Sequence, residues 1–116
     1  MFRFEQLEIW KLAIEYGNEL YDIANDFPRR ELYGLGSQLR RAAVSISNNI
    51  AEGSGASSNK DFRSFLDTSI KSTLETVNIL YFALLRKYIT NHLRGRLYEK
   101  AEKLIRKIRA FKKTLK

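Results

Sequence analysis

The sequence predicts an all-α protein, an up-down-up-down antiparallel four-helix bundle. Apolar residues recur at steps of three and four along most of the chain, which is the spacing of buried helical faces. Helix-breaking residues are scarce, with one proline and six glycines among 116 residues. No useful stretch alternates as a strand does, and the connections are short enough for antiparallel neighbours. We interpret residues 1–116 as one domain.

The first helix is predicted over residues 7–27 and ends because Pro28 disfavours a helical conformation in the residue before it. It carries two adjacent apolar stripes. The first stripe comprises Leu7, Trp10, Ile14, Gly17, Tyr21 and Ala24. The second comprises Ile9, Ala13, Tyr16, Leu20, Ile23 and Phe27. A bundle helix needs one buried stripe, so the surplus favours contact with another copy of the chain.

The second helix is predicted from Arg29 to Glu52. Its buried stripe comprises Leu32, Leu35, Leu39, Ala42, Ile46, Asn49 and Gly53. The run Gly-Ser-Gly at 53–55 should end this helix through a left-handed glycine cap. The only loop of substance follows, over residues 53–59.

The third helix should begin with Ser58 or Asn59 as its N-cap and continue to about Tyr88. Thr90 or Asn91 should cap the fourth helix. The stripe of that helix has heptad spacing and comprises Leu97, Ala101, Leu104, Ile108, Phe111 and Leu115. Most of the aromatic residues are expected in the core, with the remainder at a subunit interface.

The composition argues against several classes of protein. There is no cysteine, no signal-peptide pattern and no apolar run near the ~20 residues that span a bilayer, so we expect a soluble, cytoplasmic protein. One histidine, His92, lacks the Glu-x-x-His motif of bundle metal sites, because Ile89 stands three residues before it. The glycine-rich stretch at 53–60 does not fit a phosphate-binding loop. We therefore expect no enzyme activity, no cofactor and no metal.

The net charge of +8 comes from the C-terminal part of the chain. Residues 86–116 hold 12 Lys/Arg against 2 Asp/Glu, whereas residues 1–58 hold 6 against 8. Such a block indicates an RNA or DNA partner, an acidic protein surface or a solvated helix face. Membrane binding is disfavoured because the bundle needs the apolar stripe of this helix. Glu99–Lys103 and Glu102–Arg106 should form local ion pairs. The candidate nucleic-acid-binding residues are Arg86, Lys87, Arg94, Arg96, Lys100, Lys103, Arg106, Lys107, Arg109 and Lys113.

The stretch SISNNIAEGSG, residues 45–55, mixes buried-type and polar residues. Its small residues allow close helix packing, and Asn48, Asn49 and Glu52 should lie on or near the inward side set by its isoleucines. Buried polar groups need hydrogen bonds and can fix helix register or partner choice. We expect a structural joint rather than a ligand site or a solvated surface. The candidate joint and interface residues are Arg40, Arg41, Ser45, Asn49 and Glu52.

The order FP-x-x-E-x-Y-G-L-x-x-Q-x-R-R-A-x-x-S-I-x-x-N-I-A-E-G, from Phe27 to Gly53, resembles the four-helix bundle proteins also called intervening-sequence proteins of bacterial large-subunit ribosomal RNA. The resemblance weakens beyond about residue 85. One departure is Lys71, at a position where the family has glycine on the third helix.

The resemblance implies a homopentameric ring of four-helix protomers, without enzyme activity, with relatives that accompany a reverse transcriptase. The leading hypothesis is an oligomer that binds RNA or other nucleic acid through its basic C-terminal helix. The alternative is a scaffold or adaptor for a protein such as a reverse transcriptase.

Overall fold

The computed structural model describes residues 1–116 and contains four long helices and no strand. The helices are α1 (Glu8–Asn25), α2 (Leu35–Ser54), α3 (Asn59–Leu85) and α4 (Asn91–Lys113). Short 3-10 turns cover Arg3–Gln6 and Arg29–Glu31. The prediction of an all-α fold with four packed helices is confirmed. None of these helices combines the length and the hydropathy needed to cross a bilayer.

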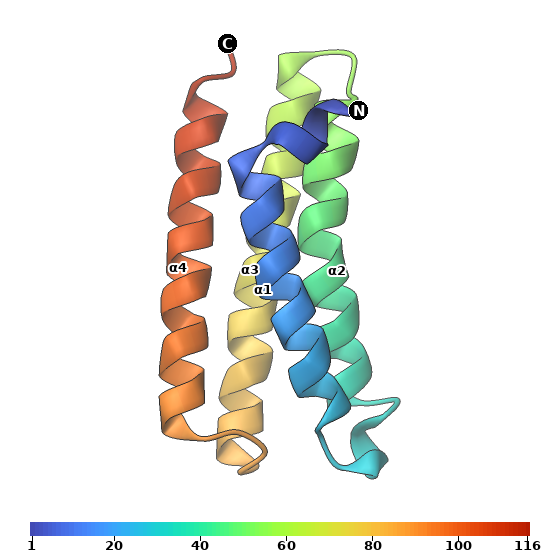
Figure 1. The fold of residues 1–116 in the computed structure, drawn as a ribbon, viewed down its shortest axis with the longest axis vertical. Coiled ribbons are helices and arrows are strands. Elements are labelled where there is room, and N and C mark those ends of the chain that lie inside the picture. Colours follow the sequence, from blue (N-terminus) through green and yellow to red (C-terminus); the bar gives the residue numbers. More distant parts are fainter.

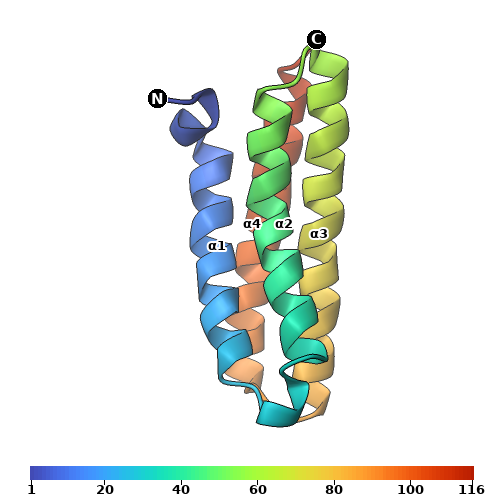
Figure 2. The ribbon, with the colours of Figure 1, turned by 90° about the vertical axis from the view of Figure 1, so that its right-hand side faces the viewer.

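The helices occupy the four corners of a bundle whose longest dimension is 44 Å. Contacts join α1 to α2, α2 to α3, α3 to α4 and α4 to α1. The α1–α2 edge and the α3–α4 edge are therefore opposite faces, as Figures 1 and 2 show. In Figure 1, α1 and α3 run downward while α2 and α4 run upward. Helices α1 and α3 thus lie parallel on one diagonal of the bundle.

One continuous core fills the space between the four helices. All four contribute side chains that solvent does not reach, because each helix turns one apolar stripe inward. The largest apolar side chains in this group are Leu20, Leu39, Ile46, Ile50, Phe62, Leu66, Leu80, Leu97, Leu104 and Ile108. These residues hold the helices rigidly enough to give the surface side chains defined positions.

Two glycines let helices approach closely. A Cβ on Gly17 of α1 would lie 3.0 Å from the carbonyl oxygen of Ala43 on α2. A Cβ on Gly53 of α2 would lie 2.8 Å from ring atom Cδ1 of Phe62 and 2.8 Å from Cβ of Phe65. Helix α2 is therefore packed tightly against both of its neighbours.

The N-terminal caps of the last two helices agree with the sequence. The hydroxyl of Ser58 accepts a hydrogen bond from the N–H of Asp61, at 3.1 Å, and that of Thr90 accepts from the N–H of Leu93, at 3.1 Å. Each cap satisfies a backbone donor that the first helical turn leaves free.

The predicted start of the second helix is wrong, because α2 begins at Leu35 and not at Arg29. The carboxylate of Glu31 caps α2 instead, accepting a hydrogen bond from the N–H of Leu35 at 3.1 Å. Its other oxygen accepts from the hydroxyl of Tyr88 at 2.8 Å. These two bonds lower the pKa of Glu31. A side chain beyond α3 therefore fixes the turn that precedes α2.

The predicted helix ends also need correction. Helix α2 reaches Ser54, and Gly55 has a φ of −97°, so no left-handed glycine cap forms there. Helix α3 ends at Leu85 and not at Tyr88. The left-handed residue is Lys87, with a φ of 64°, and it allows the N–H of Tyr88 to bond the carbonyl of Ala83 at 2.8 Å.

The surplus apolar stripe of α1 remains partly at the surface, although its Gly17 and Ala24 are buried. Ile14 and Tyr21 are each 42% exposed, whereas the stripe that contains Ala13 and Leu20 is buried. The expectation that most aromatic residues lie in the core holds only in part. Tyr16, Phe27 and Phe62 are buried, while Tyr21, Tyr33, Tyr81 and Phe82 are exposed.

Candidate nucleic-acid interface

Helix α4 presents its cations on three sides, and three of the cations on the side that faces α1 are paired with carboxylates. Arg96 and Lys100 both contact the carboxylate of Glu19, Lys100 at 2.8 Å. Lys107 pairs with Glu8 at 3.2 Å. Three of the ten predicted nucleic-acid-binding residues therefore tie α4 to α1.

The Glu19 carboxylate pairs with two of these three cations. Burial opposes its ionisation, but the hydrogen bonds from Arg96 and Lys100 outweigh burial and lower the pKa of Glu19. The group is thus charged at neutral pH and holds both cations. A polyanion would have to displace Glu19 before it could use them.

The side of α4 that faces α3 begins with an arginine held by aromatic rings. The guanidinium of Arg94 lies 5.3 Å from the ring centroid of Tyr81 and 5.5 Å from that of Tyr98. Its Nε atom is buried without a hydrogen-bond partner. Farther along, Lys112 pairs with Asp67 of α3 at 2.6 Å. Arg94 is thus occupied by cation–π contacts that fix its side chain.

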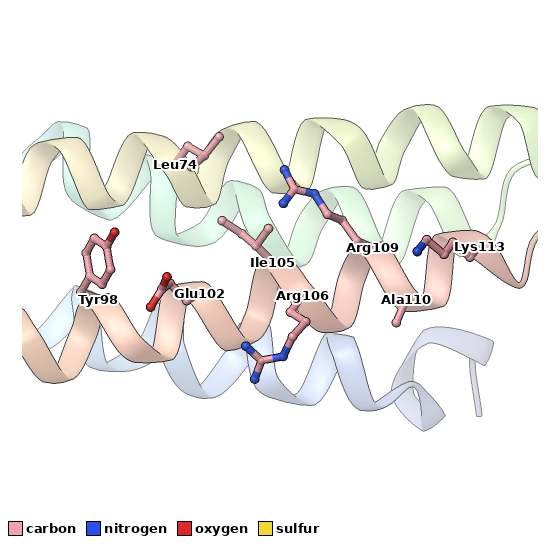
Figure 3. A pocket seen from close by; sticks show the side chains of 8 residues that line it. All are labelled: Leu74, Tyr98, Glu102, Ile105, Arg106, Arg109, Ala110 and Lys113. Carbon is pink, nitrogen blue, oxygen red and sulfur yellow. The ribbon is translucent and has the colours of Figure 1, made fainter.

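Three unpaired cations gather at the C-terminal half of α4. Arg106, Arg109 and Lys113 contact no carboxylate. They line a groove of about 740 Å³ between α3 and α4, together with Leu74, Tyr98, Glu102, Ile105 and Ala110. Figure 3 shows Arg106 and Arg109 pointing to opposite sides of α4, with Arg109 directed toward α3. We call Arg106, Arg109 and Lys113 the basic triad.

The local ion pairs predicted along α4 are absent. Neither Glu99–Lys103 nor Glu102–Arg106 forms a salt bridge. The acids on α1 and α3 provide the partners of α4 instead. Arg106 therefore keeps its charge available, with Glu102 as the one acid in the lining of the groove.

The remaining predicted cations lie apart from the basic triad. Lys103 lines a small groove between α1 and α4 with Glu15 and Lys100. Arg86 and Lys87 are exposed at the α3–α4 turn, at the opposite end of α4 from Lys113. The structure therefore separates the ten predicted residues into neutralised, aromatic-bound and unpaired groups.

The predicted joint lies between α2 and α3 and is built around Ser45. Its hydroxyl is 2.9 Å from that of Ser72 on α3, and the amide of Asn49 donates to the hydroxyl and to the carbonyl of Ser45. Asn48 and Glu52 are exposed, so their predicted inward position is wrong. Asn48 and Glu52 are exposed because the helical period places them on the side of α2 opposite the buried Ile46 and Ile50.

The two arginines of the joint have different partners. Arg41 lies 3.9 Å from Glu75 of α3, across two exposed side chains. Arg40 donates to the carbonyl of Leu32 at 2.8 Å, which stabilises the turn before α2. Neither arginine contacts Glu52.

Sequence patterns alone missed the apolar floor of the groove. Leu74 lies outside the buried face of α3, and it is 51% exposed. A large apolar residue off the buried stripes is the signal that could have identified it.

A comparison with family models found that the one described as 23S rRNA-intervening sequence protein matches residues 5–110. This range includes all four helices except the last turn of α4. A search among curated proteins found no match.

Proposed function

The chain belongs to the 23S rRNA-intervening sequence protein family, and we propose that it is a non-enzymatic, self-associating protein that binds RNA. The proposal includes the homopentameric ring that the family resemblance implies and a cytoplasmic location. Helix α4 supplies the RNA contacts, with the basic triad as their centre.

The observation that carries this proposal is the unpaired state of Arg106, Arg109 and Lys113 beside an apolar groove. Four other cations of α4 form salt bridges with carboxylates of α1 or α3. The three residues of the basic triad form none, and they line the same groove. Lysine and arginine contacts to phosphates supply affinity without reading sequence.

A scaffold function is the second candidate, and one observation favours it. Tyr81, Phe82 and Leu85 on α3 are 53%, 53% and 65% exposed, and large exposed apolar residues mark protein contacts. Such a contact would be much less sensitive to salt than phosphate binding.

Measuring RNA affinity across a series of salt concentrations distinguishes the two functions. A variant with Arg106, Arg109 and Lys113 each changed to glutamine should bind single-stranded RNA more weakly. The slope of log affinity against log salt should be shallower by about 2, because each lost single-strand phosphate contact contributes about 0.7.

The matched control changes Lys11, Lys60 and Lys71 to glutamine, three exposed lysines that also form no salt bridge. Both variants lose three positive charges, so the control measures the effect of net charge alone. Equal slopes for the two variants would refute the basic triad as the contact site. A wild-type protein that binds no RNA at low salt would refute RNA binding and leave the scaffold function.

A further inference from the structure

Two exposed apolar strips lie on opposite faces of the bundle. On the α1–α2 face, Ile14, Tyr21 and Val44 line a groove of about 470 Å³. On the α3–α4 face the strip comprises Leu74, Tyr81, Phe82, Leu85 and Tyr98. We call these the α1–α2 groove and the α3–α4 strip. Neither is covered within one chain.

The two surfaces lie at the same level along the bundle. Tyr16 of α1 bonds Thr76 of α3, and the two helices run in the same direction, so residues 60 apart in sequence share a level. Ile14 and Leu74 differ by 60, as do Tyr21 and Tyr81. Each pair of exposed residues spans two helical turns, about 10 Å. The Ile14–Tyr21 pair of the groove and the Leu74–Tyr81 pair of the strip therefore match in length and in level along the bundle.

Their charges are also complementary. Glu15 is the one charged residue that lines the α1–α2 groove, and Asp22 follows Tyr21 directly. The α3–α4 strip is flanked by two cations, Arg94, whose guanidinium lies over the rings of Tyr81 and Tyr98, and Arg86, which follows Leu85 directly. Two copies brought together at these faces would place unlike charges around the apolar contact.

We propose that the α1–α2 groove of one copy receives the α3–α4 strip of a second copy, head to tail and without axial displacement. The inference rests on the self-association included in the proposed function, and it names the surfaces. Because opposite faces take part, the contact is heterologous, and each copy retains one free surface of each kind. Such contacts form a ring when the rotation from one copy to the next closes, and the equal level of the two surfaces adds no rise along the bundle.

This contact leaves the basic triad free. Lys112 pairs with Asp67 and Arg94 lies over Tyr81, so Leu74 is level with about residue 103 of α4. Arg106, Arg109 and Lys113 lie beyond that level, toward the C-terminus of α4. In the assembly every copy presents its basic triad at the same end.

The test uses two blocked variants of the full chain. Ile14→Glu with Tyr21→Glu blocks the groove, and Leu74→Glu with Tyr81→Glu blocks the strip. Light scattering after size exclusion should give the wild type a mass of several chains, and each variant alone the mass of one chain, 13.6 kDa. Mixed in equal amounts, the two variants should form a pair, because one retains the strip and the other the groove.

The control is Gln38→Glu with Thr68→Glu, two exposed positions that line neither surface, and it should keep the wild-type mass. Serine in place of glutamate at the four apolar positions gives a milder set if the helical circular dichroism of a blocked variant is lost.

A blocked variant that keeps the wild-type mass would refute the assigned surfaces while self-association stands. A blocked variant that forms a dimer alone would show a symmetric contact. A wild type with the mass of one chain would refute self-association as well, and the RNA assay would still report separately on the basic triad.

A second measurement uses the absence of cysteine from the sequence. Tyr21→Cys and Tyr81→Cys chains, mixed and treated with a short bifunctional maleimide, should cross-link as mixed pairs. Each chain alone should give far less product. Equal cross-linking in the separate samples would contradict the head-to-tail contact.

Discussion

The hydroxyl of Tyr16 on α1 donates a hydrogen bond to the hydroxyl of Thr76 on α3, with 2.9 Å between the oxygens. Thr76 has one hydroxyl hydrogen and donates it to the carbonyl of Thr73 at 2.6 Å, so Tyr16 is the donor of the pair. Both residues are buried, and the bond crosses the bundle between diagonal helices. It fixes the axial register of α1 against α3, on which the equal level of the two apolar surfaces depends.

Tyr16→Phe should lower the free energy of unfolding by about 1 kcal/mol, because it removes one buried hydrogen bond and keeps the ring. Urea denaturation measures the change. Tyr21→Phe is the control, since Tyr21 is exposed and its hydroxyl has no protein partner, and it should change stability by less than ~0.5 kcal/mol. Equal effects of the two substitutions would contradict the role of the Tyr16–Thr76 bond.

The stability of the fold should fall at alkaline pH. Burial raises the pKa of Tyr16 from 10.0 to about 12, so the folded protein holds this proton more tightly than the unfolded chain does. The stabilisation is complete below pH 10 and is lost as the pH rises toward 12. The loss should approach roughly 3 kcal/mol, at 1.36 kcal/mol for each unit of pKa difference.

Urea denaturation of wild type and Tyr16→Phe at pH 8 and pH 11.5 would test this. The wild type should be the more stable at pH 8, and its advantage should shrink or reverse at pH 11.5. A constant difference between the two proteins would show that Tyr16 ionises alike in the folded and unfolded chains.

Glu19→Gln should destabilise the fold near neutral pH by less than about 1 kcal/mol, because Arg96 and Lys100 are partly exposed and solvent screens the pairs. The pKa of Glu19 is lowered in the folded state, so its stabilisation is present above the ordinary pKa and is lost as the pH falls through the folded value. The stability difference between wild type and Glu19→Gln should therefore vanish in acid. Thermal unfolding at pH 7 and pH 2.5 measures it, and a difference that persists at pH 2.5 would assign the effect to packing.

Gly53→Ala and Gly95→Ala should have opposite effects. A Cβ at Gly53 would lie 2.8 Å from atoms of Phe62 and Phe65, so α2 and α3 must separate, at a cost of about 1–3 kcal/mol. A Cβ at Gly95 meets nothing within 4 Å, and alanine should stabilise the interior of α4 by up to about 1 kcal/mol. Denaturation midpoints measure both, and a Gly53→Ala protein as stable as wild type would contradict the close contact.

The helices could be predicted from the sequence because their signals are local. The spacing of apolar residues and the caps at Ser58 and Thr90 lie within single helical segments. The start of α2 could not be predicted in this way, because Glu31 is oriented by Tyr88, 57 residues away. Nothing in the pattern around Arg29 reports that contact.

The sequence predicted which cations α4 carries, but not which of them are paired with carboxylates in the fold. The sequence shows the excess of cations on α4, yet it does not show that Glu8 and Glu19 of α1 neutralise Lys107, Arg96 and Lys100. Those pairs join residues at opposite ends of the chain. Local spacing predicted a Glu102–Arg106 ion pair that does not form. The sequence pattern therefore did not indicate that Arg106 is unpaired.

The pair of Glu8 and Lys107 allows a prediction that connects this arrangement to RNA binding. Glu8→Gln should release Lys107, which lies one residue after Arg106, and so add a cation to the basic triad. One additional phosphate contact should raise the affinity for single-stranded RNA on the order of fivefold at 0.1 M salt, and should steepen the salt slope by up to about 0.7.

The control is Glu52→Gln, which raises the net charge equally at an exposed residue without a cationic partner. Fluorescence anisotropy of a labelled oligonucleotide across a salt series measures both proteins. If the two variants gain affinity equally, net charge alone drives binding; a gain confined to Glu8→Gln requires that RNA contact α4 beside Arg106.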